Sequence, residues 1–130
     1  MTHFGFPKAY KLRSKKEIET LFSQGHTSFV FPLKVVWQLY PQYNEVSPIK
    51  VAVSVSKKRF KHAVTRNRIK RIIRESARMY FPEIESYLQL HNCSLVCVII
   101  YVDTNIPTFK TVFSHLNQAF QQILRTHEDT

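Results

Sequence analysis

A stretch with helical periodicity and two unlike faces, residues 63–80, constrains the fold of this chain more than any other feature. Because successive helical residues turn by about 100°, apolar and small side chains gather on one side of it and cations on the other. The apolar side holds Ile69, Ile72, Ile73, Ser76, Ala77 and Tyr80. The opposite side holds Arg66, Lys70, Arg71, Arg74 and Arg78, with Asn67 near the middle of the arc and Arg68 at its edge. Such a helix has to pack its apolar side on another layer while its cations face outward.

Nearly all of the net charge lies in this helix and the residues just before it. Residues 57–78 contain ten Lys and Arg against one acid, Glu75, a net charge of +9 out of +10 for the whole chain. A cluster this dense repels itself unless a partner supplies counter-charge. A solvated face is the ordinary interpretation of a charged run, but this concentration favours a site for a polyanion: a nucleic acid, an anionic membrane surface or an acidic protein.

The cations of the helix favour phosphate in particular. Five of the six from Arg66 to Arg78 are arginine, whose planar guanidinium forks onto phosphate oxygens and stacks on bases. The first turn of the helix adds free backbone N–H groups and the positive end of the helix dipole. The pattern predicts a rigid nucleic-acid-binding face.

The other elements follow from capping signals and periodicity. Ser14 and Glu17 form a capping-box pattern that predicts a short helix ending at Gly25. Alternating patterns predict strands over residues 29–40 and 49–57, joined by a turn over 41–48 and paired antiparallel. A third short strand near residues 43–48 stays open. The apolar run 95–102 predicts a strand covered on both faces, and a long amphipathic helix starts at Phe109, capped by Thr108 or Asn105.

The order of elements is therefore α-β-β-α-β-α, which predicts an α+β sandwich. A length of 130 residues, 44% of them hydrophobic, suits one domain spanning residues 1–130. Residues 1–12 are expected to form an N-terminal arm and residues 126–130 a C-terminal tail. The arm carries Phe4, Phe6 and Tyr10, which either pack on the domain or reach for RNA.

Several classes of function are disfavoured. Cys93 and Cys97 are too few for a disulfide framework, and buried reduced thiols explain them better than zinc does. No signal peptide is evident, and the longest apolar run is too short to cross a bilayer, so a cytoplasmic protein is expected. The acids do not pair on one element to hold two metals, which argues against a self-sufficient metal nuclease.

One segment resembles a known family. Residues 54–75 read SVSKKRFKHAVTRNRIKRIIRE, which closely resembles the signature of the bacterial ribonuclease P protein subunit. The core of that signature is the motif Arg66, Asn67, Arg68. Together with the order of elements and the length, the resemblance covers the chain from about Leu12 to Arg125.

The resemblance implies a fold and an activity. The family fold has a small mixed sheet, with the Arg-rich helix in a left-handed crossover between the second and last main strands, as in a domain of a ribosomal protein. The family's protein is the subunit of an endoribonuclease holoenzyme that removes the 5′ leader of precursor tRNA. The chemistry resides in a large catalytic RNA that uses Mg²⁺. We therefore expect no catalytic residue and no metal on the chain, and as partners the catalytic RNA and precursor tRNA, without DNA, membrane or an obligate protein.

The resemblance also implies two sets of site residues. The RNA-subunit-binding set comprises Lys58, Arg59, Lys61, Arg66, Asn67, Arg68, Lys70, Arg71 and Arg74. The leader-binding cleft, between the first helix and the sheet, comprises Ile18, Phe22, Val35, Trp37, Ser54, Ser56 and Lys57. The family often has an aromatic residue at Ile18, a loss for which Trp37 compensates by stacking on bases. Val36 is the alternative to Val35, because a slip of one residue exchanges the faces of a strand.

Other interpretations compete with these. Phe22 and Trp37 also fit an apolar core, and Ser54 and Ser56 fit small residues under a helix. The same basic face suits a general structured-RNA or ribosome-binding module with no role in cleavage. A protein-only ribonuclease that uses His62 with nearby lysines is a weaker hypothesis. A membrane-surface role is weaker still, since the apolar side of the basic helix is needed for the core.

Overall fold

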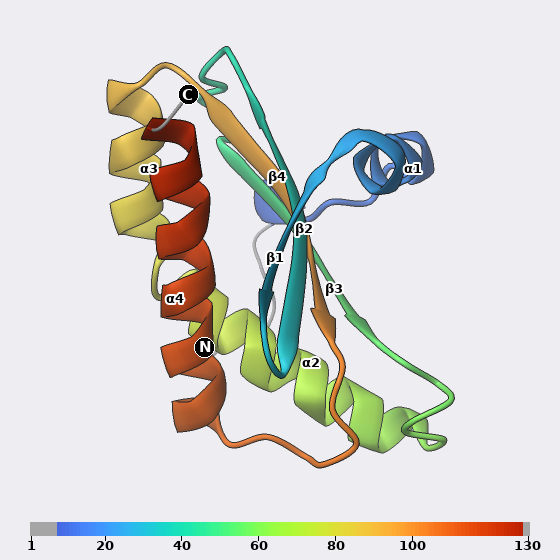
Figure 1. Ribbon diagram of the computed structural model, residues 1–130. Helices are drawn as coiled ribbons and strands as arrows, with labels where there is room; N and C mark the ends of the chain where they lie inside the picture. Colours follow the sequence, from blue (N-terminus) through green and yellow to red (C-terminus); the bar gives the residue numbers. More distant parts are fainter. Residues whose placement is uncertain (1–7, 129–130) are drawn as a thin grey trace.

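The computed structural model describes residues 8–128 and has the predicted α+β architecture (Figure 1). Its elements are η1 (Lys8–Tyr10), α1 (Lys15–Gln24), β1 (His26–Val30), β2 (Leu33–Tyr40), β3 (Ile49–Val55), α2 (Ala63–Arg78), α3 (Phe81–Leu90), β4 (Ser94–Tyr101) and α4 (Phe109–Glu128). Helices α2, α3 and α4 lie on one side of the sheet, and α1 lies on the other.

The predicted caps begin the helices where the sequence places them. The Ser14 hydroxyl accepts a hydrogen bond from the backbone N–H of Glu17 at 3.2 Å, and Thr108 Oγ1 accepts one from the N–H of Thr111 at 3.2 Å. The Glu17 carboxylate does not return to the cap but pairs with Lys50 of β3 at 3.3 Å. The first helix is thereby tied to the sheet by its own capping residue.

The sheet has the order β1-β2-β4-β3. β4 is antiparallel to β2 and parallel to β3, so the expected direct pairing of the strands at 29–40 and 49–57 is wrong. Alternation shows which residues share a face but not which strands are neighbours. β4, buried along nearly its whole length, takes the central place that a strand covered on both faces requires. The chain passes from β3 to β4 through α2 and α3; the left hand of this crossover stays a prediction.

The predicted strand over residues 29–40 is in fact a hairpin. β1 and β2 meet at a tight turn around a cis Phe31–Pro32 bond, and Val30 pairs with Leu33. The additional strand therefore lies at residues 26–30. Near residues 43–48 the structure has a turn, in which the side-chain oxygen of Asn44 accepts the N–H groups of Val46 and Ser47 at 3.0 Å.

The chain ends differ from the prediction. Leu12 donates its N–H to the carbonyl of Val51 at 3.1 Å, and the Tyr10 ring stands edge-on to Phe81 at 5.2 Å, so the arm packs on the domain from Lys8 onward. Phe4 and Phe6 lie outside the described residues. At the other end, residues 126–128 form the last turn of α4 rather than a tail. Between α2 and β4 the structure also has a helix that the predicted order of elements lacks, α3, which begins at Phe81 with Pro82 in its first turn.

The alternation of the strands divides the core into two parts. The larger part lies between the sheet and α2, α3 and α4, and the smaller part lies beneath α1. The smaller part consists of Leu12, Leu21, Val36, Val96 and Val98, with Ile18, Ala52 and Ile100 packed against it. Full burial of each aliphatic side chain contributes about 1.5–3 kcal/mol, so the large core holds the basic helix firmly.

Cys93 and Cys97 are buried free thiols, as expected. Burial raises the pKa of Cys97 to about 12, which keeps this thiol protonated and unreactive. Among residues 8–128, no helix is both long and apolar enough to cross a membrane.

Candidate nucleic-acid interface

The basic face of α2 is rigidly mounted. Ile69, Ile73, Ser76 and Ala77 are fully buried, which confirms the predicted apolar side. On the outer side, Asn67, Arg68 and Arg71 are exposed and Lys70 and Arg74 are half-buried. The backbone that carries these side chains is fixed by the core, so less freedom is lost when they bind a partner.

Arg66 differs from its neighbours because its side chain supports the loop before α2. Its Nη1 donates to the carbonyls of Phe60 at 2.8 Å and Lys61 at 2.9 Å. Phe60, only 8% exposed, anchors the same loop in the core. Arg66 therefore shapes the segment that leads into the basic helix, whatever else it contacts.

A side-chain hydrogen bond also fixes the start of this loop. Ser56 Oγ accepts the N–H groups of Lys58 at 3.1 Å and Arg59 at 3.4 Å. Ser56 is half-buried, whereas Lys58, Arg59 and Lys61 are exposed. The predicted RNA-subunit set thus lies on one continuous support, a tethered loop followed by a packed helix.

Part of the predicted leader-binding set shares the sheet face beneath α1. Ile18 packs on the small core, while Phe22 stays 52% exposed. Ser54 pairs with Ile100 of β4 and is exposed on the same face, and Lys57 follows in the exposed loop. These residues form an open surface that leads from α1 toward the start of α2.

Val35 and Trp37 do not belong to that surface, and placing them there is wrong. They are 0% and 3% exposed and lie in the large core on the opposite face of β2. The indole Nε1 of Trp37 donates to Ser28 Oγ at 3.1 Å, and the ring packs on His26 at 4.7 Å between centroids. Because side chains alternate along a strand, the alternative Val36 is the residue that faces α1.

The structure adds residues to this face that the sequence interpretation missed. Lys34 of β2 and its partner Phe29 of β1, which is 58% exposed, share the face of Val36, as does Ile100. A signal was present in the alternation of β2. Lys34 and Gln38 put polar side chains on one face of an otherwise apolar strand, and a polar row marks the more open face of a sheet.

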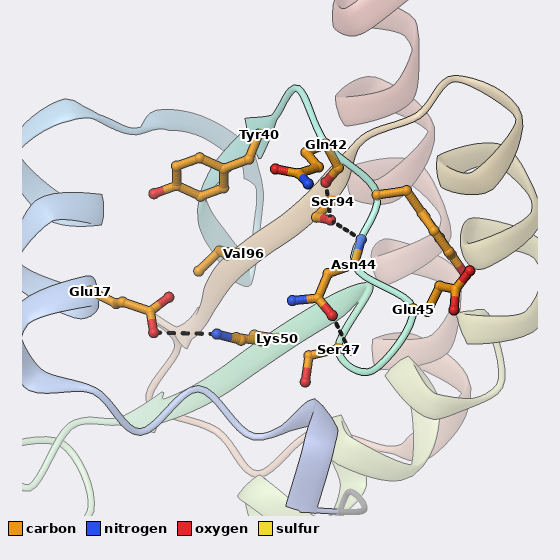
Figure 2. Close-up of a pocket in the computed structure, with 10 residues that line it drawn as sticks. Glu17, Tyr40, Gln42, Asn44, Glu45, Ser47, Lys50, Ser94 and Val96 are labelled. Atoms are coloured by element: carbon orange, nitrogen blue, oxygen red, sulfur yellow. Dashed lines mark hydrogen bonds and ion pairs between the residues drawn. The ribbon is translucent and has the colours of Figure 1, made fainter.

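A cavity on the α1 side lies apart from the predicted leader-binding residues (Figure 2). It has a volume of about 700 Å³ and is lined by Glu17, Tyr40, Gln42, Tyr43, Asn44, Glu45, Ser47, Lys50, Ser94 and Val96. None of the predicted leader-binding residues lines it. Lys50, which lies in this cavity, is paired with Glu17, and the carboxylates of Glu17 and Glu45 disfavour a phosphate ligand.

The described residues offer cations rather than metal ligands. Within residues 8–128, no three His, Cys, Asp or Glu side chains gather in a group that would hold a metal ion. His62 is exposed and stands at the N-cap of α2, without a side-chain capping bond. The chemistry of this surface is therefore the binding of anions by fixed guanidinium and ammonium groups.

Taken together, a mixed sheet, a packed arginine helix and a tethered basic loop define an α+β protein with a face suited to a polyanion such as a nucleic acid. Comparison with known proteins gives the family. The family model described as Ribonuclease P matches residues 6–124. The ribonuclease P protein component of Porphyromonas gingivalis W83 is 37% identical over 120 residues, 92% of this chain and 87% of that protein. That of a Picosynechococcus species is 37% identical over 81 residues, 62% of this chain and 66% of that protein.

A solved structure shares the fold. The ribonuclease P protein of Staphylococcus aureus superposes with a TM-score of 0.62 at 21% identity, over 89% of this chain and 96% of that one. The chain belongs to the ribonuclease P protein family. Membership of this family confirms the function expected from the resemblance. The chain is an RNA-binding subunit of the ribonuclease P endoribonuclease, which acts in tRNA 5′ processing.

Proposed function

We propose that α2 and the loop before it bind the catalytic RNA of ribonuclease P, and that this RNA performs the phosphodiester hydrolysis with Mg²⁺. The observation that carries the proposal is the row of cations on a helix whose opposite side is fully buried. Asn67, Arg68, Lys70 and Arg71 are presented from a backbone that the core holds still. In this arrangement the protein binds and orients the catalytic RNA, and the RNA carries out the hydrolysis.

The face beneath α1 is proposed to bind the 5′ leader of precursor tRNA. Phe22 offers an exposed aromatic surface for stacking on a base. Ser54 and Lys57, both exposed, supply a hydroxyl and a cation beside it. Both proposed partners are RNA, and the site of action is proposed to be the cytoplasm.

The decisive experiment is cleavage of a 5′-labelled precursor tRNA with Mg²⁺ by protein alone, by a bacterial ribonuclease P RNA alone, and by both together. We expect one cut at the mature 5′ end that requires the RNA and is strengthened by the protein. Cleavage by the protein alone would place the chemistry on its side chains and contradict the proposal. Tight RNA binding without any effect on cleavage would contradict the proposal and favour a general RNA-binding module.

The role of α2 has its own test. If about six phosphates are engaged, the logarithm of affinity for the RNA should fall with the logarithm of salt concentration with a slope of about −4 to −5. Arg68→Ala should weaken binding and reduce that slope by about one. Lys110→Ala, on the outer side of α4, removes the same charge from an exposed position and should leave the slope unchanged. Equal slopes in wild type, Arg68→Ala and Lys110→Ala would show that Arg68 does not contact the RNA.

A further inference from the structure

A further basic site lies at the outer edge of β3, where two cations outside both predicted sets, Lys11 and Arg13, join Arg74 of the RNA-subunit-binding set. There the structure has a groove of about 330 Å³ whose floor is formed by residues 51–53 of β3 and Leu12. Three cations line it: Lys11 and Arg13 from the segment before α1, and Arg74 from α2. No acidic residue is among the lining residues, so the groove carries an uncompensated positive charge.

The two cations of the N-terminal segment are held in place by the residue between them. Leu12 is 5% exposed in the small core, and its N–H is bonded to the carbonyl of Val51 at 3.1 Å. In an extended segment, neighbouring side chains point to opposite sides. Because Leu12 points into the core beneath α1, Lys11 and Arg13 point toward the side of the sheet that α2 covers, where Arg74 lies.

The backbone of β3 contributes a donor to the same groove. Lys11 forms a parallel bridge with Val51, which therefore turns its N–H and C=O toward the outer edge of the sheet. Residues two apart in a strand share that direction, so the N–H of Val53 also points outward. An amide N–H beside three cations is a combination suited to phosphate oxygens.

The place of the groove in the fold indicates what it binds. The cations of α2 lie on one side of the sheet and the open face beneath α1 lies on the other, and the β3 edge is between them (Figure 1). We propose that this groove binds a phosphodiester segment of RNA as it passes around the edge of β3. The inference rests on the proposed function and extends its surface to Lys11 and Arg13. The RNA is either the catalytic RNA or the leader of the precursor, which share this chemistry.

The test compares the wild-type protein with the double variant Lys11→Ala, Arg13→Ala. Its matched control is Lys110→Ala, Arg125→Ala, which removes the same charge from exposed positions of α4. One arm measures the salt dependence of affinity for a bacterial ribonuclease P RNA. The other arm measures the affinity of the reconstituted holoenzyme for precursor and mature tRNA. Circular dichroism and thermal unfolding verify that all three proteins are folded.

We expect the groove variant to reduce the salt slope by about one for each side chain removed, and the control to leave it unchanged. If the slope for the RNA is intact but the preference for precursor over mature tRNA falls, the groove binds the leader. Wild-type behaviour in both arms would overturn the proposal. Failure of the proposed function is distinguishable from this, because the wild-type protein itself would then show no preference for ribonuclease P RNA over unrelated structured RNA.

Discussion

At Gly25, where α1 meets the sheet, there is no room for a side chain. Its φ of −77° is ordinary, so conformational freedom does not explain the glycine. A Cβ atom there would lie 2.4 Å from the carbonyl oxygen of Leu21 and 3.0 Å from that of Trp37. Both contacts are with backbone, which cannot move aside as the end of a side chain can.

Gly25→Ala should therefore destabilise the protein by about 1–3 kcal/mol, the usual cost of overpacking. Equilibrium urea unfolding measures this. The control is Gln24→Ala, an exposed position on the preceding residue, where a change below about 0.5 kcal/mol is expected. Equal stability of Gly25→Ala and wild type would mean that the junction can widen at no cost.

Phe22 and Trp37 are both aromatic, but their surroundings separate their roles. Trp37 is 3% exposed and hydrogen-bonded within the core, whereas Phe22 is 52% exposed on α1. Phe22→Ala should weaken holoenzyme binding of precursor tRNA by about tenfold, since stacking on one base is worth about 1–3 kcal/mol. Binding of mature tRNA should not change.

The matched control for Phe22 is Phe109→Ala, an exposed aromatic on α4, for which no loss of precursor affinity is expected. Affinities for labelled precursor and mature tRNA are compared by filter binding. If Phe22→Ala weakens both RNAs equally, its ring supports the fold and does not contact the leader.

At the scale of elements, α2 and the loop before it depend on one side chain. Arg66 bonds two carbonyls of that loop through a single nitrogen, while Arg68, two residues along, is exposed. Hydrogen bonds from a charged donor contribute about 1.5–3 kcal/mol, and less where water competes. Of the two arginines in the Arg66, Asn67, Arg68 motif, Arg66 is therefore expected to contribute to the stability of the fold, and Arg68 is not.

We expect Arg66→Gln to lower the free energy of unfolding by about 1–2 kcal/mol, and Arg68→Gln, which removes the same charge, to leave it unchanged. Both variants should reduce the salt slope of RNA binding by about one. Urea unfolding and RNA titrations on the same preparations separate the two effects. A stable Arg66→Gln protein would show that the loop keeps its shape without this side chain.

The elements differ in how far the sequence predicts them. Ser14 and Thr108 cap their helices as predicted, because a cap depends on neighbouring residues alone. The side of α2 that is buried is also correct, because it follows from helical geometry. The hairpin at Pro32 was missed, since residues 29–40 were predicted as one continuous strand, which runs through the position of the turn. Val35 and Trp37 were placed on the wrong face because alternation defines two faces without saying which one α1 covers.

At the scale of the whole molecule, local sequence patterns could not predict the order of the strands in the sheet. The central position of β4 depends on contacts between residues far apart in the chain, such as Val36 with Val98 and Ala52 with Val98. Its buried character was predictable from the run 95–102, but its neighbours were not. The groove at the β3 edge was hidden for the same reason, because it brings together residues 11–13, 51–53 and 74.

The concentrated charge should make the stability of the free protein depend on salt. Ten cations between residues 57 and 78 repel one another, and screening shortens the range of that repulsion from about 10 Å at 0.1 M to about 3 Å at 1 M salt. The melting temperature should therefore rise by several degrees between low and high sodium chloride concentration. The variant Arg68→Gln, Arg71→Gln should rise less, and an equal rise in both proteins would assign the effect to other parts of the chain.

β4, the inner strand that joins β2 to β3, is the last strand in the described sequence, and this matters while the protein is being made. When β3 leaves the ribosome, β2 and β3 still lack the strand that joins them, and only the local β1–β2 hairpin has a partner. Unpaired strand edges are the surfaces on which nascent chains aggregate. α2 has the same dependence, since its buried side packs on a core that includes β4 residues Cys97 and Ile99. We therefore expect the basic face of α2 to reach its packed position only after β4 has been synthesised.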